Sequence, residues 1–295
     1  MNRFKVTQKT ELLSYLLSHL EGYKRNTIKE LLKFRAVLVN GRPVTQFNHS
    51  LVSGDTVEIK KAKKTSLKAD LFEPVYEDKD IIVIEKPAGW LTIATDKVRE
   101  RTLYYQLNEY LKHSSPSRHQ QLFIVHRLDK EVSGLLVFAK TPEAKAYLQS
   151  HWRDASKHYC ALVHGKPKES QGEIGSYLSE SKFLKVYSGP KTPESRFALT
   201  KYRTIKTTGE FSLLEVVLDT GRKHQIRVHL SDLGHPIVGD DKYGSTAKMP
   251  KRSADDPRSI ALHAFYLKLP HPATGKMMEF KSPMPKSFSI FLRAR

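Results

Sequence analysis

One aspartate in this chain, Asp129, stands in a setting that suits a reactive carboxylate. It lies in a short polar segment between Arg127 and Lys130, and apolar runs flank that segment at 122–125 and 135–139. This pattern predicts a strand, a loop that carries Asp129, and a second strand. Nearby cations favour the ionised form of a carboxylate even where water is partly excluded. Such an aspartate can act as a nucleophile or base, although most loop aspartates only cap turns or form ion pairs.

The residues around Asp129 favour the catalytic interpretation. Residues 126–129 read His-Arg-Leu-Asp, and residues 133–140 read Ser-Gly-Leu-Leu-Val-Phe-Ala-Lys. This pattern resembles the catalytic motif of RNA pseudouridine synthases of the His-Arg-Leu-Asp type. The resemblance implies that Asp129 is the nucleophile. Arg127 would fill the position that the flipped base leaves or bind the RNA backbone, unless it is only an ion-pair partner. Val132 departs from the family, which usually has threonine there.

Two later segments resemble the family's other motifs, in the family's order. Residues 157–165 read as a strand, and the family's tyrosine falls on Tyr159. Thr220-Gly221-Arg222 predicts a turn that leads into a helix ending at Gly234. The family's active-site arginine falls on Arg227 in that helix. If the strands before the two motifs are neighbours, the start of this helix points back to the sheet edge near Asp129.

The expected reaction breaks the bond between C1′ and N1 of a uridine, turns the base and rejoins it through C5. Asp129 would attack either the sugar or the base, and the sequence does not choose between them. Arg227 would pair with Asp129 and keep it ionised, because a buried carboxylate without a partner takes up a proton. Tyr159 would offer a flat face to the uracil and a phenolic oxygen for proton transfer. The reaction needs no redox step or energy input, so we expect no cofactor.

The charge of the chain points to a polyanionic partner. Lys and Arg total 50 against 31 Asp and Glu, a formal net charge of +19, which favours nucleic acid over a membrane surface. The start of the sequence lacks the apolar core of a signal peptide, and no apolar run is long enough to span a bilayer. We therefore expect a cytoplasmic, monomeric protein that binds RNA. A single cysteine, Cys160, excludes an intramolecular disulfide and a cysteine-cluster metal site.

The first 60 residues form a module of their own. Leucines at 12, 13, 16, 17 and 20 predict one face of a helix, and Thr27 to Glu30 fits a capping box that opens a second. Asn40-Gly41 predicts a tight turn, and 56–59 a strand. This arrangement resembles the S4 RNA-binding module, although its basic face could be only solvated. The cations expected to contact RNA are Lys24, Arg25, Lys29, Lys33, Arg35 and Arg42 here, and Arg222, Lys223 and His224 near Arg227.

The expected fold is α+β. A small S4-like module at 1–60 is followed by a basic linker at 61–72 and a catalytic domain at 73–295, whose mixed, largely antiparallel sheet is flanked by helices. Within that domain, Thr141-Pro142-Glu143 is a well-formed helix start. The module ahead of the catalytic domain resembles the ribosomal branch of the family. Large-subunit ribosomal RNA is therefore the favoured substrate, with transfer RNA as the alternative.

Three other interpretations are weaker. A non-catalytic RNA-binding protein with this fold would be suggested by loss of the aspartate, tyrosine or arginine, and all three are present. A two-carboxylate glycoside hydrolase needs a second acid, and Asp219 and Asp240, the only candidates near the motifs, read as turn residues. A metal site is disfavoured because the spacing of four histidines matches no familiar ligand set: His224, His229, His263 and His271.

Overall fold

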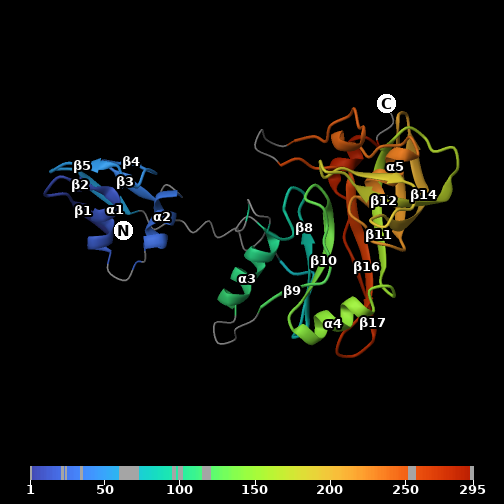
Figure 1. The fold of residues 1–295 in the computed structure, drawn as a ribbon, viewed down its shortest axis with the longest axis horizontal. Helices are drawn as coiled ribbons and strands as arrows, with labels where there is room; N and C mark the ends of the chain where they lie inside the picture. Colours follow the sequence, from blue (N-terminus) through green and yellow to red (C-terminus); the bar gives the residue numbers. More distant parts are fainter. Residues whose placement is uncertain are drawn as a thin grey trace. The chain divides into compact units, whose positions relative to one another are not determined.

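The structure is a computed structural model of the 295-residue chain, and its two compact units, 1–71 and 72–295, are drawn in Figure 1. It describes residues 2–20, 23, 25–33, 36–59, 73–94, 98, 102–114, 121–251 and 257–292. The predicted linker at 61–72 lies outside the described residues, as do Lys24 and Arg35.

The N-terminal unit holds two short helices and two small sheets. One sheet has the order β1-β6-β3-β4, and the other consists of β2 and β5. The elements are β1 (Asn2–Lys5), β2 (Thr10–Glu11), α1 (Leu12–His19), α2 (Arg25–Lys33), β3 (Val37–Val39), β4 (Arg42–Pro43), β5 (Ser50–Leu51) and β6 (Thr56–Ile59).

The leucines of α1 form much of this unit's core. Leu12, Leu13, Leu16 and Leu20 are buried against Ile28, Leu32 and the strands, as the apolar spacing predicts. The prediction that Leu17 lies on the same face is wrong, because this side chain is 39% exposed. At 3.6 residues per turn, Leu17 lies beyond the arc that the buried leucines span.

A predicted turn and a predicted helix start in this unit have different outcomes. The predicted Asn40-Gly41 turn is confirmed, with φ of 51° and 79° joining β3 to β4. The predicted capping box at Thr27 is wrong, because α2 begins at Arg25. A capping residue has extended backbone, whereas Thr27 already lies within the first helical turn.

The second unit is built on one large sheet. Its first elements are β7 (Tyr76–Glu77), β8 (Ile81–Lys86), α3 (Leu103–Ser114), β9 (Phe123–Ile124), β10 (Ser133–Ala139), α4 (Pro142–Ser150), β11 (Ser156–His164) and β12 (Gln171–Glu180). The remaining elements are β13 (Val186–Gly189), β14 (Arg196–Thr208), β15 (Phe211–Leu218), α5 (Gln225–Asp232), the 3-10 helix η2 (Asp241–Tyr243), β16 (Leu262–Pro270), β17 (Met277–Lys281) and the 3-10 helix η3 (Lys286–Ile290).

The sheet has 11 strands, with the main order β13-β12-β14-β15-β11-β16-β10-β8-β7. Strand β17 pairs with β16, and β9 pairs with β10. Its strand pairs are antiparallel except β10 with β16, which run parallel at Ser133–His263 and Gly134–Ala264. This confirms the expected α+β fold with a mixed, largely antiparallel sheet. Strand β16, late in the chain, lies between β11 and β10 and joins the two halves of the sheet.

Helices cover different parts of this sheet, as Figure 1 shows. Helix α4 buries Ala144 and Leu148 in a cluster with residues of β8, β10, β16 and β17. Its predicted start is confirmed: the Thr141 side chain accepts a hydrogen bond from the amide of Ala144 at 3.0 Å. Helix α5 buries Val228 against β12, β13 and β14. Among the helices of the described residues, none combines the length and apolar composition needed to cross a bilayer.

Candidate active site

Asp129 lies in the loop between β9 and β10, and its side chain is 27% exposed. Nη1 of Arg227, on α5, donates a hydrogen bond to Oδ2 of Asp129 at 3.3 Å. The structure therefore brings together two residues that are 98 positions apart in the sequence. They line an open pocket whose walls are Arg127, Leu128, Asp129, Val132, Tyr159, Leu218, Gly221, Arg222, His224, Gln225, Ile226, Arg227 and Leu262.

The way in which Asp129 and Arg227 meet differs from the sequence-based expectation. That expectation needed the strands preceding the two motifs to be neighbours. Strand β9, which precedes Asp129, pairs with β10, and β11 and β16 separate β10 from β15, which leads to α5. Helix α5 bridges this separation, and Tyr159 on the intervening strand β11 forms part of the pocket wall.

Arg227 is held mainly by a residue that the sequence assigned only to a turn. Nε and Nη2 of Arg227 donate to the two carboxylate oxygens of Asp240 at 2.7 and 2.9 Å. Asp240 is buried, so its interpretation as a mere turn residue is wrong. Glu131 adds a third carboxylate, 3.6 Å from Nη1. Burial acts to lower the pKa of Arg227, but Asp240, Asp129 and Glu131 outweigh it and raise that pKa, so the guanidinium stays charged.

Tyr159 is buried in β11, between its partners Ala264 on β16 and Val216 on β15. Burial and the negative charge of Asp129 both raise the pKa of Tyr159. The phenol is therefore protonated at neutral pH and can donate a proton or hydrogen bond. To accept a proton it must first lose its own, so it is not a ready base as it stands.

Comparisons with known proteins agree with this geometry. Residues 80–232, which carry the Asp129 loop, Tyr159 and Arg227, match the family model described as RNA pseudouridylate synthase. The chain belongs to the RNA pseudouridine synthase family. It is an isomerase that converts uridine to pseudouridine.

Relatives of the family resemble most of the chain. It is 33% identical over 280 residues to the ribosomal large subunit pseudouridine synthase D of Vibrio cholerae, covering 89% of this chain and 84% of that protein. It is 32% identical to an uncharacterized RNA pseudouridine synthase of Bacillus subtilis, covering 98% and 97% of the two chains. The solved structure of human RNA pseudouridylate synthase domain containing 4 is similar with a TM-score of 0.59 and 25% identity, over 73% of this chain and 90% of that one.

His126, the first residue of the synthase motif, connects the Asp129 loop to β10. Its Nε2 accepts a hydrogen bond from the amide of Val137 on β10 at 3.2 Å, and its ring lies 4.5 Å from that of Trp152. Burial and the positive charge of Lys157 lower the pKa of His126 to about 3. The imidazole is therefore neutral and can accept this bond. His126 fixes where the loop leaves the sheet.

Lys86, at the end of β8, also binds the Asp129 loop. Its buried Nζ donates to the carbonyls of Pro87, Trp90 and Lys130 at 3.2, 2.8 and 3.2 Å. Burial lowers the pKa of Lys86 to about 7, against the opposing effect of Asp129 and Glu131. Three acceptors match the three N–H groups of an ammonium. Lys86 thus connects the loop after β8 to the loop that carries the synthase nucleophile candidate.

The cations predicted near the synthase site lie around its pocket. Arg127 and Arg222 are exposed and line the pocket, and Nε of Arg222 donates to the carbonyl of Phe197 at 3.1 Å. Lys223 forms an ion pair with Glu180. His224 is turned inward: its side chain is 12% exposed, and its Nε2 lies 3.8 Å from Oδ2 of Asp129.

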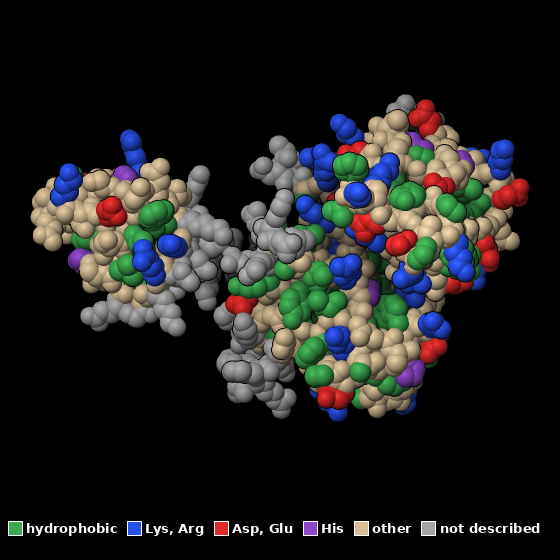
Figure 2. Space-filling view, viewed as in Figure 1, with side chains coloured by type: hydrophobic (Ala, Val, Ile, Leu, Met, Phe, Trp, Pro, Cys, Tyr) green, Lys and Arg blue, Asp and Glu red, His purple; other side chains and the backbone are tan. Residues whose placement is uncertain are grey.

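The other predicted RNA contacts belong to the N-terminal unit. Arg25, Lys29 and Arg42 are exposed, and Nζ of Lys29 lies 5.8 Å from the ring centroid of Phe47, which is 53% exposed. The side chain of Lys33 lies outside the described residues. Figure 2 shows lysine and arginine side chains on the visible face of both units.

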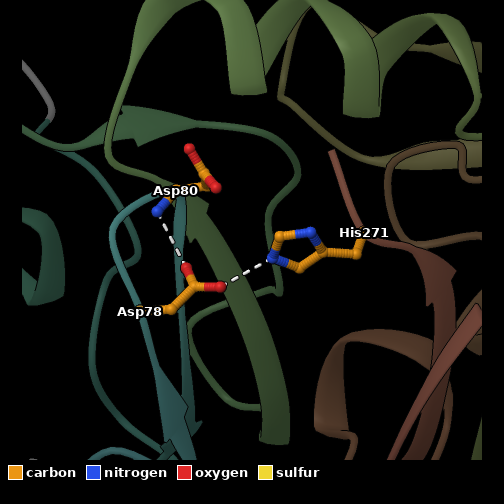
Figure 3. Close-up of side chains that lie close together, drawn as sticks. All are labelled: Asp78, Asp80 and His271. Atoms are coloured by element: carbon orange, nitrogen blue, oxygen red, sulfur yellow. Dashed lines mark hydrogen bonds and ion pairs between the residues drawn. The ribbon is translucent and has the colours of Figure 1, made fainter. Parts of the chain in front are cut away.

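One histidine–carboxylate group is compact enough to raise the question of a metal. Asp78, Asp80 and His271 each have a potential ligand atom within 4.8 Å of the others (Figure 3). Both oxygens of Asp78 already accept hydrogen bonds: Oδ1 from the amides of Asp80 and Ile81, Oδ2 from Tyr76 and His271. His271 Nδ1 accepts from the amide of Ala273, so Nε2 carries the proton. This arrangement favours a hydrogen-bonded turn over a metal site.

Sequence reasoning missed three residues that shape the site: Lys86, Asp240 and Tyr243. Lys86 extends the apolar run 81–84, and a charge on the buried side of a strand needs partners. Asp240 and Tyr243 flank a short turn after Gly239, where composition alone suggests only a loop. Their roles depend on contacts with α5, which no local pattern reveals.

Proposed function

We propose that this chain converts specific uridines to pseudouridine in large-subunit ribosomal RNA, with Asp129 as the nucleophile. The observation that carries the proposal is the hydrogen bond from Arg227 to Oδ2 of Asp129 in a pocket that also holds Tyr159. A charged guanidinium donates a charge-assisted hydrogen bond to the partly exposed carboxylate and fixes its direction. The relatives named ribosomal large subunit pseudouridine synthase D support the choice of RNA.

Asp129 would react through a defined oxygen. Its contacts with Arg227 and His224 are both made by Oδ2, so we assign Oδ1 to the attack. Attack on the sugar carbon C1′ or on the uracil ring would use the same oxygen. The bond from C1′ to N1 breaks, the base turns and C5 joins C1′. The bond to Oδ1 breaks again and the carboxylate is regenerated, C5 loses its proton and N1 gains one. Tyr159, protonated and buried beside the carboxylate, would form one wall for the turning base.

A uridine in folded RNA must leave its stack to enter this pocket, at a cost of a few kcal/mol. Exposed Arg127, at the pocket rim, is placed to occupy the position the base vacates or to bind backbone. We propose that the N-terminal unit adds phosphate contacts through Arg25, Lys29 and Arg42. Its S4-like order of helices and strands and its exposed cations support this role.

The experiment that tests the nucleophile is Asp129→Asn in a tritium-release or mass-based assay on ribosomal RNA transcripts. We expect no conversion and nearly unchanged RNA affinity, because the amide keeps the shape of the side chain but not its nucleophilicity. Asp154→Asn, at an exposed aspartate, is the matched control and should convert uridine like wild type. Substantial turnover by Asp129→Asn would remove the assignment.

The choice of RNA needs a separate experiment. Pseudouridines in ribosomal and transfer RNA are mapped in cells that lack this protein, with and without a plasmid that restores it. We expect a position in large-subunit ribosomal RNA to lose its pseudouridine and regain it with the plasmid. Loss confined to transfer RNA would show that the substrate assignment is wrong and leave the chemistry in place.

A further inference from the structure

His224 has an unusual backbone for a residue other than glycine. Its φ is 53°, in the left-handed region, where the described residues hold only Asn40 and Leu184 besides glycines. Histidine adopts this region more readily than most side chains, but a helix start does not require it. His224 directly precedes α5, and its carbonyl accepts the helical hydrogen bond from the amide of Val228 at 3.0 Å. This conformation costs free energy that its contacts must offset.

The ring of His224 lies between a tyrosine and the nucleophile. Nδ1 is 2.7 Å from the hydroxyl of Tyr243, and Nε2 is 3.8 Å from Oδ2 of Asp129. Tyr243 is buried, and the amide of Val186 donates to its hydroxyl oxygen at 3.2 Å. With that lone pair occupied, the hydroxyl directs its own proton to Nδ1. The second nitrogen, Nε2, then carries the proton of the neutral ring and presents it to Asp129.

The surrounding charges support a neutral ring. Burial lowers the pKa of His224, Asp129 opposes this effect, and the cations Arg227, Lys242 and Lys223 add to it. The hydroxyl can act as a donor because burial raises the pKa of Tyr243 to about 12. The Tyr243 ring also lies 5.1 Å from the guanidinium carbon of Arg227, so one residue contacts both groups that face the carboxylate.

We propose that His224 is a positioning residue for the nucleophile, with its tautomer set by Tyr243. The Nε2–H of a neutral His224 and the Nη1–H of Arg227 approach the same oxygen, Oδ2, from two sides. Together they hold the carboxylate so that Oδ1 faces the pocket. A small movement on RNA binding brings Nε2 from 3.8 Å to hydrogen-bond distance. This inference rests on Asp129 being the nucleophile.

Two substitutions remove the two ends of this contact. His224→Asn keeps a side chain that tolerates the left-handed backbone but cannot reach Asp129 as the imidazole does. Tyr243→Phe keeps the ring beside Arg227 and removes only the hydroxyl. Each should lower the single-turnover rate at saturating RNA by about tenfold, the scale of one hydrogen bond to a charged group, with RNA affinity nearly unchanged. Tyr202→Phe, another buried tyrosine, is the control and should keep the wild-type rate.

The double variant gives the decisive measurement. If Tyr243 acts through His224, adding Tyr243→Phe to His224→Asn should change the rate by less than about twofold. Urea unfolding of each variant measures general destabilisation separately. Any destabilisation by Tyr243→Phe should be the same with His224 or asparagine at position 224, whereas its effect on the rate should depend on His224. Independent multiplication of the two rate effects would overturn the inference. So would a His224→Asn variant that loses affinity and keeps the wild-type rate, since His224 would then be a phosphate contact.

Asp129→Asn, assayed alongside, keeps the two proposals distinct. Turnover by Asp129→Asn would show that Asp129 is not the nucleophile, and it would overturn this inference as well. An inactive Asp129→Asn together with a fully active His224→Asn would overturn only the role of His224.

Discussion

Arg227 gives two of its hydrogen bonds to Asp240 and one to Asp129. The bond lengths show the same division: 2.7 and 2.9 Å to Asp240, 3.3 Å to Asp129. Asp240 therefore fixes the plane of the guanidinium, and the remaining Nη1 is directed at the carboxylate in the pocket. A forked, planar cation suits this task because its donors keep a fixed angle to one another. The buried carboxylate of Asp240 thus orients, through Arg227, the carboxylate of Asp129 in the pocket.

Asp240→Asn should reduce activity through Arg227 and not through a contact with the RNA. The new amide keeps one acceptor oxygen, so Arg227 loses one of its two hydrogen bonds at this position. Its Nη1 is then directed less accurately at Asp129. We expect the single-turnover rate to fall by about tenfold or more, with RNA affinity close to wild type. Asp241→Asn changes the neighbouring, 70% exposed carboxylate and should have little effect on either quantity. Equal losses in the two variants would show that the turn, not the contact with Arg227, matters.

Arg227→Ala should destabilise the fold as well as abolish efficient turnover. It leaves Asp240 buried without its cation, and breaking a buried ion pair costs about 3–5 kcal/mol. Arg227→Lys restores the charge but not the fork, so stability should recover more than the rate does. Urea unfolding and single-turnover kinetics at saturating RNA measure the two effects. If Arg227→Ala keeps the wild-type rate and loses only RNA affinity, Arg227 is a phosphate contact.

Asp78 should give the fold a stability that disappears in acid. Burial acts to raise the pKa of Asp78, but hydrogen bonds from the amides of Ile81 and Asp80 and from His271 and Tyr76 outweigh it and lower that pKa. A carboxyl with a lowered pKa stabilises the folded state above its unfolded pKa of about 3.9, and this contribution is lost as the pH falls through the folded value. Asp78→Asn should therefore be less stable than wild type at pH 7.

The difference between the two proteins should shrink as the pH falls below about 4. Urea unfolding of both proteins from pH 7 to pH 3 measures it. A gap that stays constant over this range would mean that the charge of Asp78 contributes nothing.

The N-terminal cations should contribute to RNA affinity by binding phosphates. Replacing Arg25, Lys29 and Arg42 together by alanine should weaken binding and flatten the slope of log affinity against log salt. The slope should change by about 0.7–0.9 for each phosphate that is no longer neutralised. The single-turnover rate at saturating RNA should stay at the wild-type value. A charge-matched control replaces three exposed lysines of the second unit: Lys168, Lys276 and Lys281. The same slope in both variants would mean that the N-terminal unit does not contact the RNA backbone.

Local patterns predicted much of the secondary structure because they depend on neighbours in the sequence. The apolar run 135–139 predicted the strand that is β10, and the Thr141-Pro142 start predicted α4. Asp129, Arg227 and Tyr159 came from motif resemblance, and the structure places them around one pocket. The pairing of Arg227 with Asp129 was predicted and the structure contains it, but the other partners of these residues could not be predicted. Asp240 and Tyr243 matter only because of the contacts that α5 makes, and those are set by packing between distant segments.

The same limit explains why the sheet order was not predicted. No pattern in β16 indicates that it runs parallel to β10 and antiparallel to β11. How apolar a strand is depends on whether its two faces are covered, not on which strands pair with its edges, so the sequence of β16 does not identify its neighbours.

The position of β16 bears on when the enzyme becomes active. Residues 262–270 are synthesised after the segments that carry Asp129, Tyr159 and Arg227. They form the strand that joins the half of the sheet that holds β10, next to the Asp129 loop, to the half that carries Tyr159. Contacts between such distant segments form late, because closing the long loop between them costs entropy first. Before that strand is made, a chain on the ribosome has the Asp129 loop and helix α5 without the strand that lies between the two halves of the sheet. We therefore expect RNA modification to begin only after residues 262–270 have been translated and β16 has joined the sheet, so that activity reports on completed folding of this sheet.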